Sequence, residues 1–109
     1  MAFDTDLADR VREIVATEPG LTERRMFGGL AFLLHGRMAV AATDEGLLLR
    51  VDPQHTDELV EAPGVGRFVM RDREMNGWLR VGADAVTTDE ALREWVAHGV
   101  AYAAALPPK

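Results

Sequence analysis

Three apolar runs in the first half of the chain are separated by very short turns. Met26–His35, Arg37–Thr43 and Leu47–Val51 have the composition of β-strands, and the turns contain His35-Gly36 and Asp44-Glu45-Gly46. Tight turns of this kind join antiparallel strands, whereas parallel neighbours need a crossover of about a dozen residues. The spacing therefore predicts an antiparallel meander.

Helical patterns flank these strands. Residues 4–17 place apolar side chains at helical spacing, and Pro19-Gly20 ends the pattern. A second helix is predicted to begin at Asp52-Pro53, because Asp is a good N-cap and Pro is tolerated in the first turn. Pro63-Gly64 is predicted to end it.

A last helix is predicted from Thr87, with Thr88 as the alternative cap, to Pro107-Pro108. Trp95 and Tyr102 are seven residues apart and therefore share a face of this helix. We expect these two aromatic side chains to be core or dimer contacts.

Two further strands, Arg67–Met70 and Trp78–Val81, are predicted around a charged loop. Trp78 is interpreted as a core residue, with a bulged strand edge or a binding aromatic beside Arg80 as alternatives. The predicted order is helix, three strands, helix, two strands, helix. The sequence thus predicts one α+β domain over residues 1–109, with a single antiparallel sheet.

Alternation of side chains gives the predicted sheet two largely apolar faces. One face is expected to hold Phe32, Leu34, Met38, Val40, Leu47, Leu49, Val51, Leu79 and Val81. The opposite face is expected to hold Ala31, Leu33, Arg37, Ala39, Ala41, Leu48, Arg50, Trp78 and Arg80. Because both faces require cover, the second is predicted to be a surface for self-association or ligand binding, unless the last helix covers it.

Composition limits the chemistry that we expect. The formal net charge of −6 disfavours non-specific nucleic-acid binding, and the absence of cysteine excludes disulfides, thiolate nucleophiles and Cys-type zinc sites. Serine is absent too, and His35, His55 and His98 lack the spacing of a metal motif. We therefore expect neither catalytic residues, nor a metal, nor a cofactor.

No stretch of the sequence approaches the roughly 20 apolar residues of a membrane span. The N-terminal residues also lack the basic and apolar regions of a secretory signal. We therefore expect a cytoplasmic protein with no membrane partner.

The strongest local motif is the segment Arg24-Arg25-Met26-Phe27-Gly28-Gly29. Paired glycines between large apolar residues permit a positive φ or the close approach of another chain segment. We interpret the pair as a bulge or tight turn that admits the first strand to the sheet. The alternative is an anion site formed by its amides beside Arg24 and Arg25.

This motif resembles the N-terminal domain of the TfoX/Sxy family, which includes bacterial regulators of natural competence. The resemblance is carried by Arg25, Met26, Phe27, Gly28 and Gly29, and it continues through Gly46–Asp52, Gly77–Val81 and a final helix at residues 88–105. It implies the order α-β3-α-β2-α, similar to the secretion-chaperone-like fold. It implies no catalytic residue, and we expect a single-domain member without the C-terminal helical domain of longer relatives.

Together these observations predict a small non-catalytic regulatory module that acts through protein contacts, as a homodimer. Its candidate interface residues are Arg24, Arg37, Leu48, Arg50, Trp78 and Arg80, with Arg37, Arg50 and Arg80 pairing carboxylates of the partner.

The alternative is a module that binds an anion, a nucleotide or nucleic acid through Arg24, Arg25, Arg50, Arg71, Arg73 and Arg80. An enzyme that uses paired carboxylates is the least favoured interpretation, because no such pair stands out.

Overall fold

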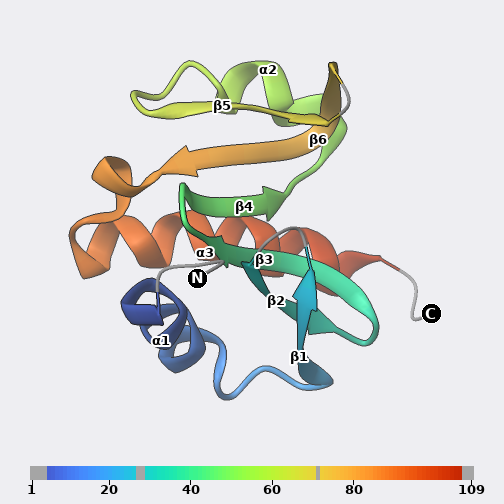
Figure 1. The fold of residues 1–109 in the computed structure, drawn as a ribbon. Helices are drawn as coiled ribbons and strands as arrows, with labels where there is room; N and C mark the ends of the chain where they lie inside the picture. Colours follow the sequence, from blue (N-terminus) through green and yellow to red (C-terminus); the bar gives the residue numbers. More distant parts are fainter. Residues whose placement is uncertain (1–4, 27–28, 71, 107–109) are drawn as a thin grey trace.

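The computed structural model describes residues 5–26, 29–70 and 72–106 (Figure 1). The chain forms an α+β fold with one sheet. Its helices are α1 (Thr5–Val15), the 3₁₀ turn η1 (Pro53–His55), α2 (Thr56–Leu59), the 3₁₀ turn η2 (Ala83–Val86) and α3 (Asp89–Ala105). Its strands are β1 (Leu21–Met26), β2 (Gly29–Leu34), β3 (Arg37–Thr43), β4 (Gly46–Arg50), β5 (Val65–Met70) and β6 (Arg73–Gly82).

The strands lie in the order β1-β2-β3-β4-β6-β5, and every neighbouring pair is antiparallel. The predicted antiparallel meander is therefore confirmed for β2, β3 and β4. The predicted order of elements was incomplete, because β1 adds a strand between α1 and β2. Strand β1 is defined by its pairing with β2. Its Thr22-Glu23-Arg24-Arg25 stretch has no alternation of apolar residues, so the sequence pattern did not indicate a strand. A likeness to the secretion-chaperone-like fold stays a prediction.

The helix boundaries follow their caps. Asp52 accepts a hydrogen bond from the Gln54 amide at the start of η1, as its position before Pro53 predicted. The α-helical part of this second helix is shorter than expected, since α2 ends at Leu59. At α3 the alternative cap is the one used, because the Thr88 side chain accepts a hydrogen bond from the Ala91 amide.

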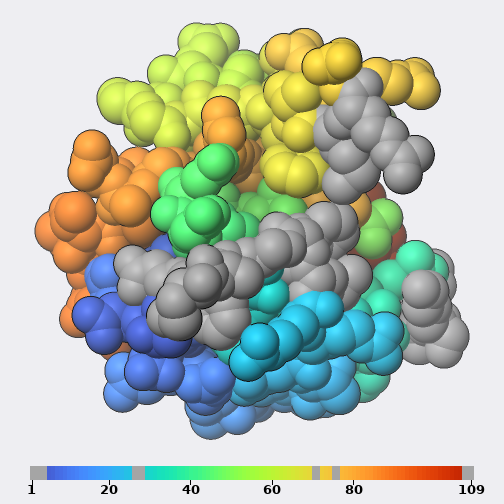
Figure 2. Space-filling view, viewed as in Figure 1, coloured from blue at the N-terminus to red at the C-terminus, as the bar shows by residue number. Residues whose placement is uncertain are grey.

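Both long helices pack on the same face of the sheet. Leu7 and Val11 of α1 and Leu92 and Val96 of α3 are buried in one cluster with side chains of β2, β3, β4 and β6. In Figure 1 α3 runs behind the sheet, and in Figure 2, seen from the same side, its atoms are almost hidden. One sheet face therefore has a helical cover.

A bulge in β3 reverses part of the predicted assignment of faces. Phe32 pairs with Val40 and Leu33 pairs with Met38, which leaves Ala39 as an extra residue. Ala39 consequently lies with the helix-covered cluster and Met38 with the opposite one. These two predictions were wrong because strict alternation fails at a bulge.

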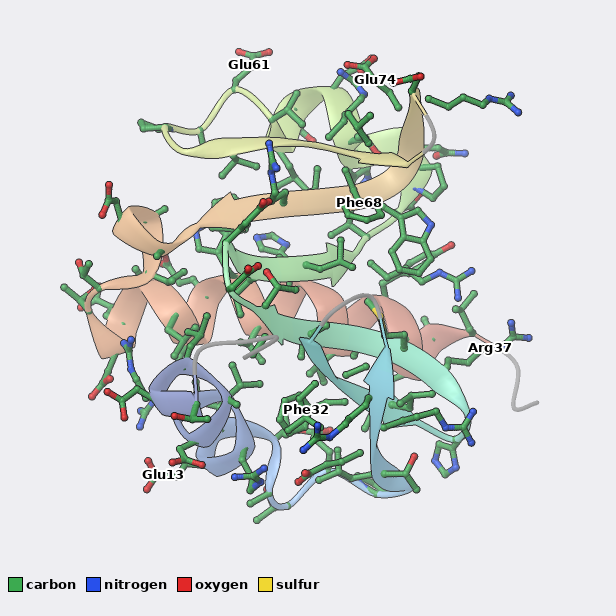
Figure 3. The ribbon with its side chains drawn as sticks, viewed as in Figure 1. Glu13, Phe32, Arg37, Glu61, Phe68 and Glu74 are labelled. Carbon is green, nitrogen blue, oxygen red and sulfur yellow. The ribbon has the colours of Figure 1, made fainter. Side chains whose placement is uncertain are left out.

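The opposite face forms a second, smaller apolar cluster, made of Ala31, Leu33, Met38, Ala41 and Leu48. Phe68 of β5, labelled in Figure 3, and Trp78 of β6 pack against it. The expectation of an open apolar face was wrong, because none of the five cluster residues is more than 7% exposed. Within the described residues, the one large hydrophobic side chain that is exposed is Val69, at 52%.

Candidate functional site

Four of the six predicted interface residues lie together on two neighbouring strands. Leu48 of β4 pairs with Arg80 of β6, and Arg50 pairs with Trp78 in the same ladder. Directly paired residues of antiparallel strands project from the same face. The sequence prediction therefore placed these four side chains on one face correctly.

Arg24 belongs to the same row, although it lies on the far edge of the sheet. The pairings join Arg24 to Ala31, then to Ala41, Leu48 and Arg80. The middle of this row is buried, since Ala31, Ala41 and Leu48 are each at most 2% exposed. Leu48 consequently supports the fold and offers no surface to a partner.

Arg37 does not join this group. It pairs with Leu34, which lies in the helix-covered cluster, so the β3 bulge moves Arg37 off the face that the alternation predicted.

Arg50 is held between two aromatic rings. Its guanidinium carbon lies 5.5 Å from the centre of the Trp78 ring and 5.7 Å from the centre of the Tyr102 ring. Both distances are within the range of a cation–π contact. Arg50, at the end of β4, therefore links Trp78 of β6 to Tyr102 of α3, and its guanidinium is engaged within the chain.

The arginines proposed as an anion site are not gathered into one cluster among the described residues. Arg24 and Arg25 lie on β1, Arg73 and Arg80 on β6, and three strands separate β1 from β6 in the sheet. Arg80 donates a hydrogen bond to Glu45 at 2.8 Å, and the sixth residue, Arg71, lies outside the described part of the chain. The geometry therefore does not favour the anion-binding alternative.

A groove runs between α3 and the segment that contains η1 and α2. It has a volume of about 670 Å³ and is termed here the α3 groove. Its walls are formed by Val51, Asp52, His55, Leu59, Glu94, Trp95, Ala97, His98, Ala101, Tyr102 and Ala105. No sequence pattern indicated this groove, although the shared helix face of Trp95 and Tyr102 was a signal for one of its walls.

A buried hydroxyl fixes the other wall of the groove. Thr56 is fully buried, and its Oγ1 accepts a hydrogen bond from the Gly77 amide at 3.1 Å. The same hydroxyl lies 3.5 Å from the Asp52 carbonyl oxygen, to which it donates. Gly77 has a φ of 83° and sits where β6 departs from β5, since Arg67 pairs with Leu79 but Phe68 pairs with Met75. A bulge is thus present next to Trp78, which is half-buried, but the alternative of a bulged edge was wrong, because β6 is an interior strand that pairs with both β4 and β5.

The α3 groove combines aromatic and acidic groups. The Trp95 and His98 rings are 5.5 Å apart between centroids, and Tyr102 continues the same helix face. Asp52 and Glu94 supply carboxylates, and no lysine or arginine is among the lining residues. Within residues 5–26, 29–70 and 72–106, no group of three or more His, Asp or Glu side chains is placed to hold a metal ion. The groove therefore offers apolar contact and negative charge.

Part of the glycine motif is explained by close packing of the backbone. A Cβ atom on Gly29 would lie 2.2 Å from the Ala42 carbonyl oxygen, so only glycine fits where the start of β2 lies beside the end of β3. Arg25 lies on β1 and Met26 is its last residue, whereas Phe27 and Gly28 lie outside the described residues. Gly29 supports the structural interpretation of the motif.

One ion pair ties α1 to the edge strand β1. Arg12 donates hydrogen bonds to both carboxylate oxygens of Glu23, at 2.8 and 3.0 Å, and a third to Asp9. The hydrogen bonds from Arg12 lower the pKa of the Glu23 carboxyl, although partial desolvation acts in the opposite direction. The same contacts raise the pKa of Arg12.

The family model for the TfoX N-terminal domain matches residues 13–103. The chain belongs to this family. The match spans the sheet and most of α3, so this TfoX N-terminal domain includes every lining residue of the α3 groove except Ala105. No curated protein and no solved structure matches the chain. No helix in the described part of this domain is both long enough and apolar enough to cross a membrane.

Proposed function

We propose that this TfoX N-terminal domain is a non-catalytic regulatory module that acts through protein contacts, as a homodimer. Membership of the family supports a regulatory role. Control of transcription and a cytoplasmic location are part of the same proposal. The observation that carries the proposed dimer is the difference between the two edges of the sheet.

The β1 edge is protected by charge. It carries Glu23, Arg24 and Arg25, and Glu23 is held by Arg12 of α1. Charged side chains on an edge strand oppose pairing with another sheet. We therefore expect the β1 edge to remain unpaired.

The β5 edge lacks this protection. Its one charged residue, Arg67, is bound by Asp57 of α2, and Val69 is 52% exposed. An edge strand of this kind presents unpaired N–H and C=O groups beside an apolar side chain. Figure 1 shows β5 at the border of the sheet, opposite to the β1 end.

Two copies related by a two-fold axis can pair their β5 strands in antiparallel fashion. Such pairing would continue the sheet from one protomer into the other and remove Val69 from water. This arrangement replaces the predicted contact through the second sheet face, where Leu48 is buried and Arg80 is bound to Glu45.

Sedimentation equilibrium on three proteins tests the proposal. We expect the unaltered chain to be a dimer at micromolar concentration and Val69→Glu to be a monomer, because two buried carboxylates would face each other across the axis. Thr22→Glu places the same charge on an exposed residue of β1 and should remain dimeric. Circular dichroism checks that both variants are folded. A monomeric unaltered chain at high micromolar concentration, or a dimeric Val69→Glu variant, would refute the β5 dimer.

A further inference from the structure

We propose that the α3 groove binds a basic amphipathic segment of a partner protein. This inference extends the proposed protein-contact function to a second surface, because no residue that lines the groove belongs to β5.

The apolar part of the groove has the dimensions of a helix-binding surface. Trp95 and Tyr102 are half-buried and seven residues apart on α3, so they lie about 10 Å apart along the helix axis. Leu59 of α2 adds an apolar contact from the opposite wall. A partner helix with apolar side chains two turns apart would match this spacing.

The charge of the groove selects a basic partner. Asp52 and Glu94 are both lining residues, and no ion pair within the described residues neutralises either carboxylate. No lining residue carries a fixed positive charge, and the nearby Arg50 guanidinium, which is not a lining residue, is engaged by the Trp78 and Tyr102 rings. Lysine or arginine side chains beside the apolar face of a partner segment would therefore find carboxylates at the rim, which favours them over an acidic segment.

The walls of the groove are held in place before any partner binds. The Arg50 guanidinium lies against the Tyr102 ring, and Thr56 joins the η1–α2 wall to β6 through the Gly77 amide. Ordering of side chains and loops is one of the costs of association, so a groove with fixed walls binds with a smaller loss of entropy.

The probe is a synthetic Leu/Lys peptide of about 14 residues with apolar positions at helical spacing. Its fluorescein-labelled form is titrated with protein at low salt, and anisotropy reports binding. We expect saturable binding by the unaltered chain, whereas the matched Leu/Glu peptide should not bind.

Two exposed alanines of α3 provide a matched pair of variants. Ala101 lines the groove, whereas Ala104 lies outside it, so Ala101→Arg and Ala104→Arg add the same charge to the same helix. We expect Ala101→Arg to weaken binding by about tenfold or more and Ala104→Arg to change it by about twofold at most. Equal losses in the two variants, no binding by the unaltered chain, or equal binding of the Leu/Glu peptide would overturn the proposal.

The Val69→Glu variant separates this proposal from the homodimer. We expect it to bind the Leu/Lys peptide as tightly as the unaltered chain does, because Val69 is not a lining residue. Peptide binding without dimers would refute the β5 interface alone, and dimers without peptide binding would refute the groove site alone.

Discussion

Gly99 of α3 packs directly against the backbone of β3 at Ala39. A Cβ atom on Gly99 would lie 2.3 Å from the Ala39 carbonyl oxygen and 3.4 Å from a methyl carbon of Leu49. We predict that Gly99→Ala destabilises the fold by about 1–2 kcal/mol, because the cost of overpacking exceeds the gain in helix propensity. Chemical denaturation measures the change.

Gly66 of β5 is the control for this substitution. A Cβ atom there would meet no heavy atom within 4 Å. Gly66→Ala is expected to leave the free energy of unfolding unchanged or to raise it by up to about 1 kcal/mol. If Gly99→Ala were as stable as Gly66→Ala, α3 would not approach the sheet as closely as the structure shows.

Thr56 is predicted to stabilise the η1–α2 wall through its hydroxyl. Thr56→Val keeps the shape of the side chain but leaves the buried Gly77 amide without an acceptor. We expect a loss of about 1–3 kcal/mol in the free energy of unfolding. Thr56→Ser retains the hydroxyl and should lose less, and Thr87→Val at an exposed position should have little effect. A neutral Thr56→Val variant would contradict the assigned hydrogen bond.

Arg50 is predicted to couple the sheet to α3 through its two aromatic neighbours. Arg50→Met removes the cation and keeps much of the stem, so we expect a loss of about 0.5–1 kcal/mol for each ring contact. A double-mutant cycle with Tyr102→Leu isolates the contact with α3. Arg93→Met, at an exposed position of α3, is the comparison. Additive effects of the two substitutions would show that Arg50 and Tyr102 do not interact.

The Arg12–Glu23 ion pair predicts a pH dependence of stability. The pKa of Glu23 is lowered in the folded chain, so its contribution is present above the ordinary pKa of a glutamate and is lost as the pH falls through the folded value. Glu23→Gln should therefore destabilise the chain at neutral pH, and the difference from the unaltered chain should shrink under acidic conditions. Denaturation at several pH values measures it. A difference that grows on acidification would have the wrong sign.

The sequence predicted those parts of the fold that depend on local patterns. The short turns after Leu34 and Thr43 identified the meander, and Asp52-Pro53 identified one helix start. The start of the last helix was predicted one residue too early, at Thr87, because both threonines can cap and the structure uses the alternative, Thr88. Strand β1 was not predicted, because an edge strand can carry charged residues and needs no apolar alternation. The charged residues Arg24 and Arg25 interrupt any apolar pattern that would have indicated this strand.

The candidate site was only partly predictable, for reasons of register and distance. Arg50 and Trp78 were placed on one face because alternation holds along β4, whereas Arg37 was misplaced because the bulge at Ala39 shifts the register of β3. The α3 groove is lined by residues as far apart in the sequence as His55 and His98, and their proximity depends on how the η1–α2 segment packs, which no local pattern reveals.

The packing of both long helices on one sheet face also constrains how the chain is made. Strands β1 to β4 follow one another closely and can pair during synthesis, but Leu92, Val96 and Ala103 complete the main core from near the end of the sequence. A nascent chain still attached to a ribosome would therefore expose Leu47, Leu49 and Val40 until α3 had left the exit tunnel. Stable folding of this domain should therefore wait until α3 has left the tunnel, and a chain arrested before α3 should be a substrate for chaperones.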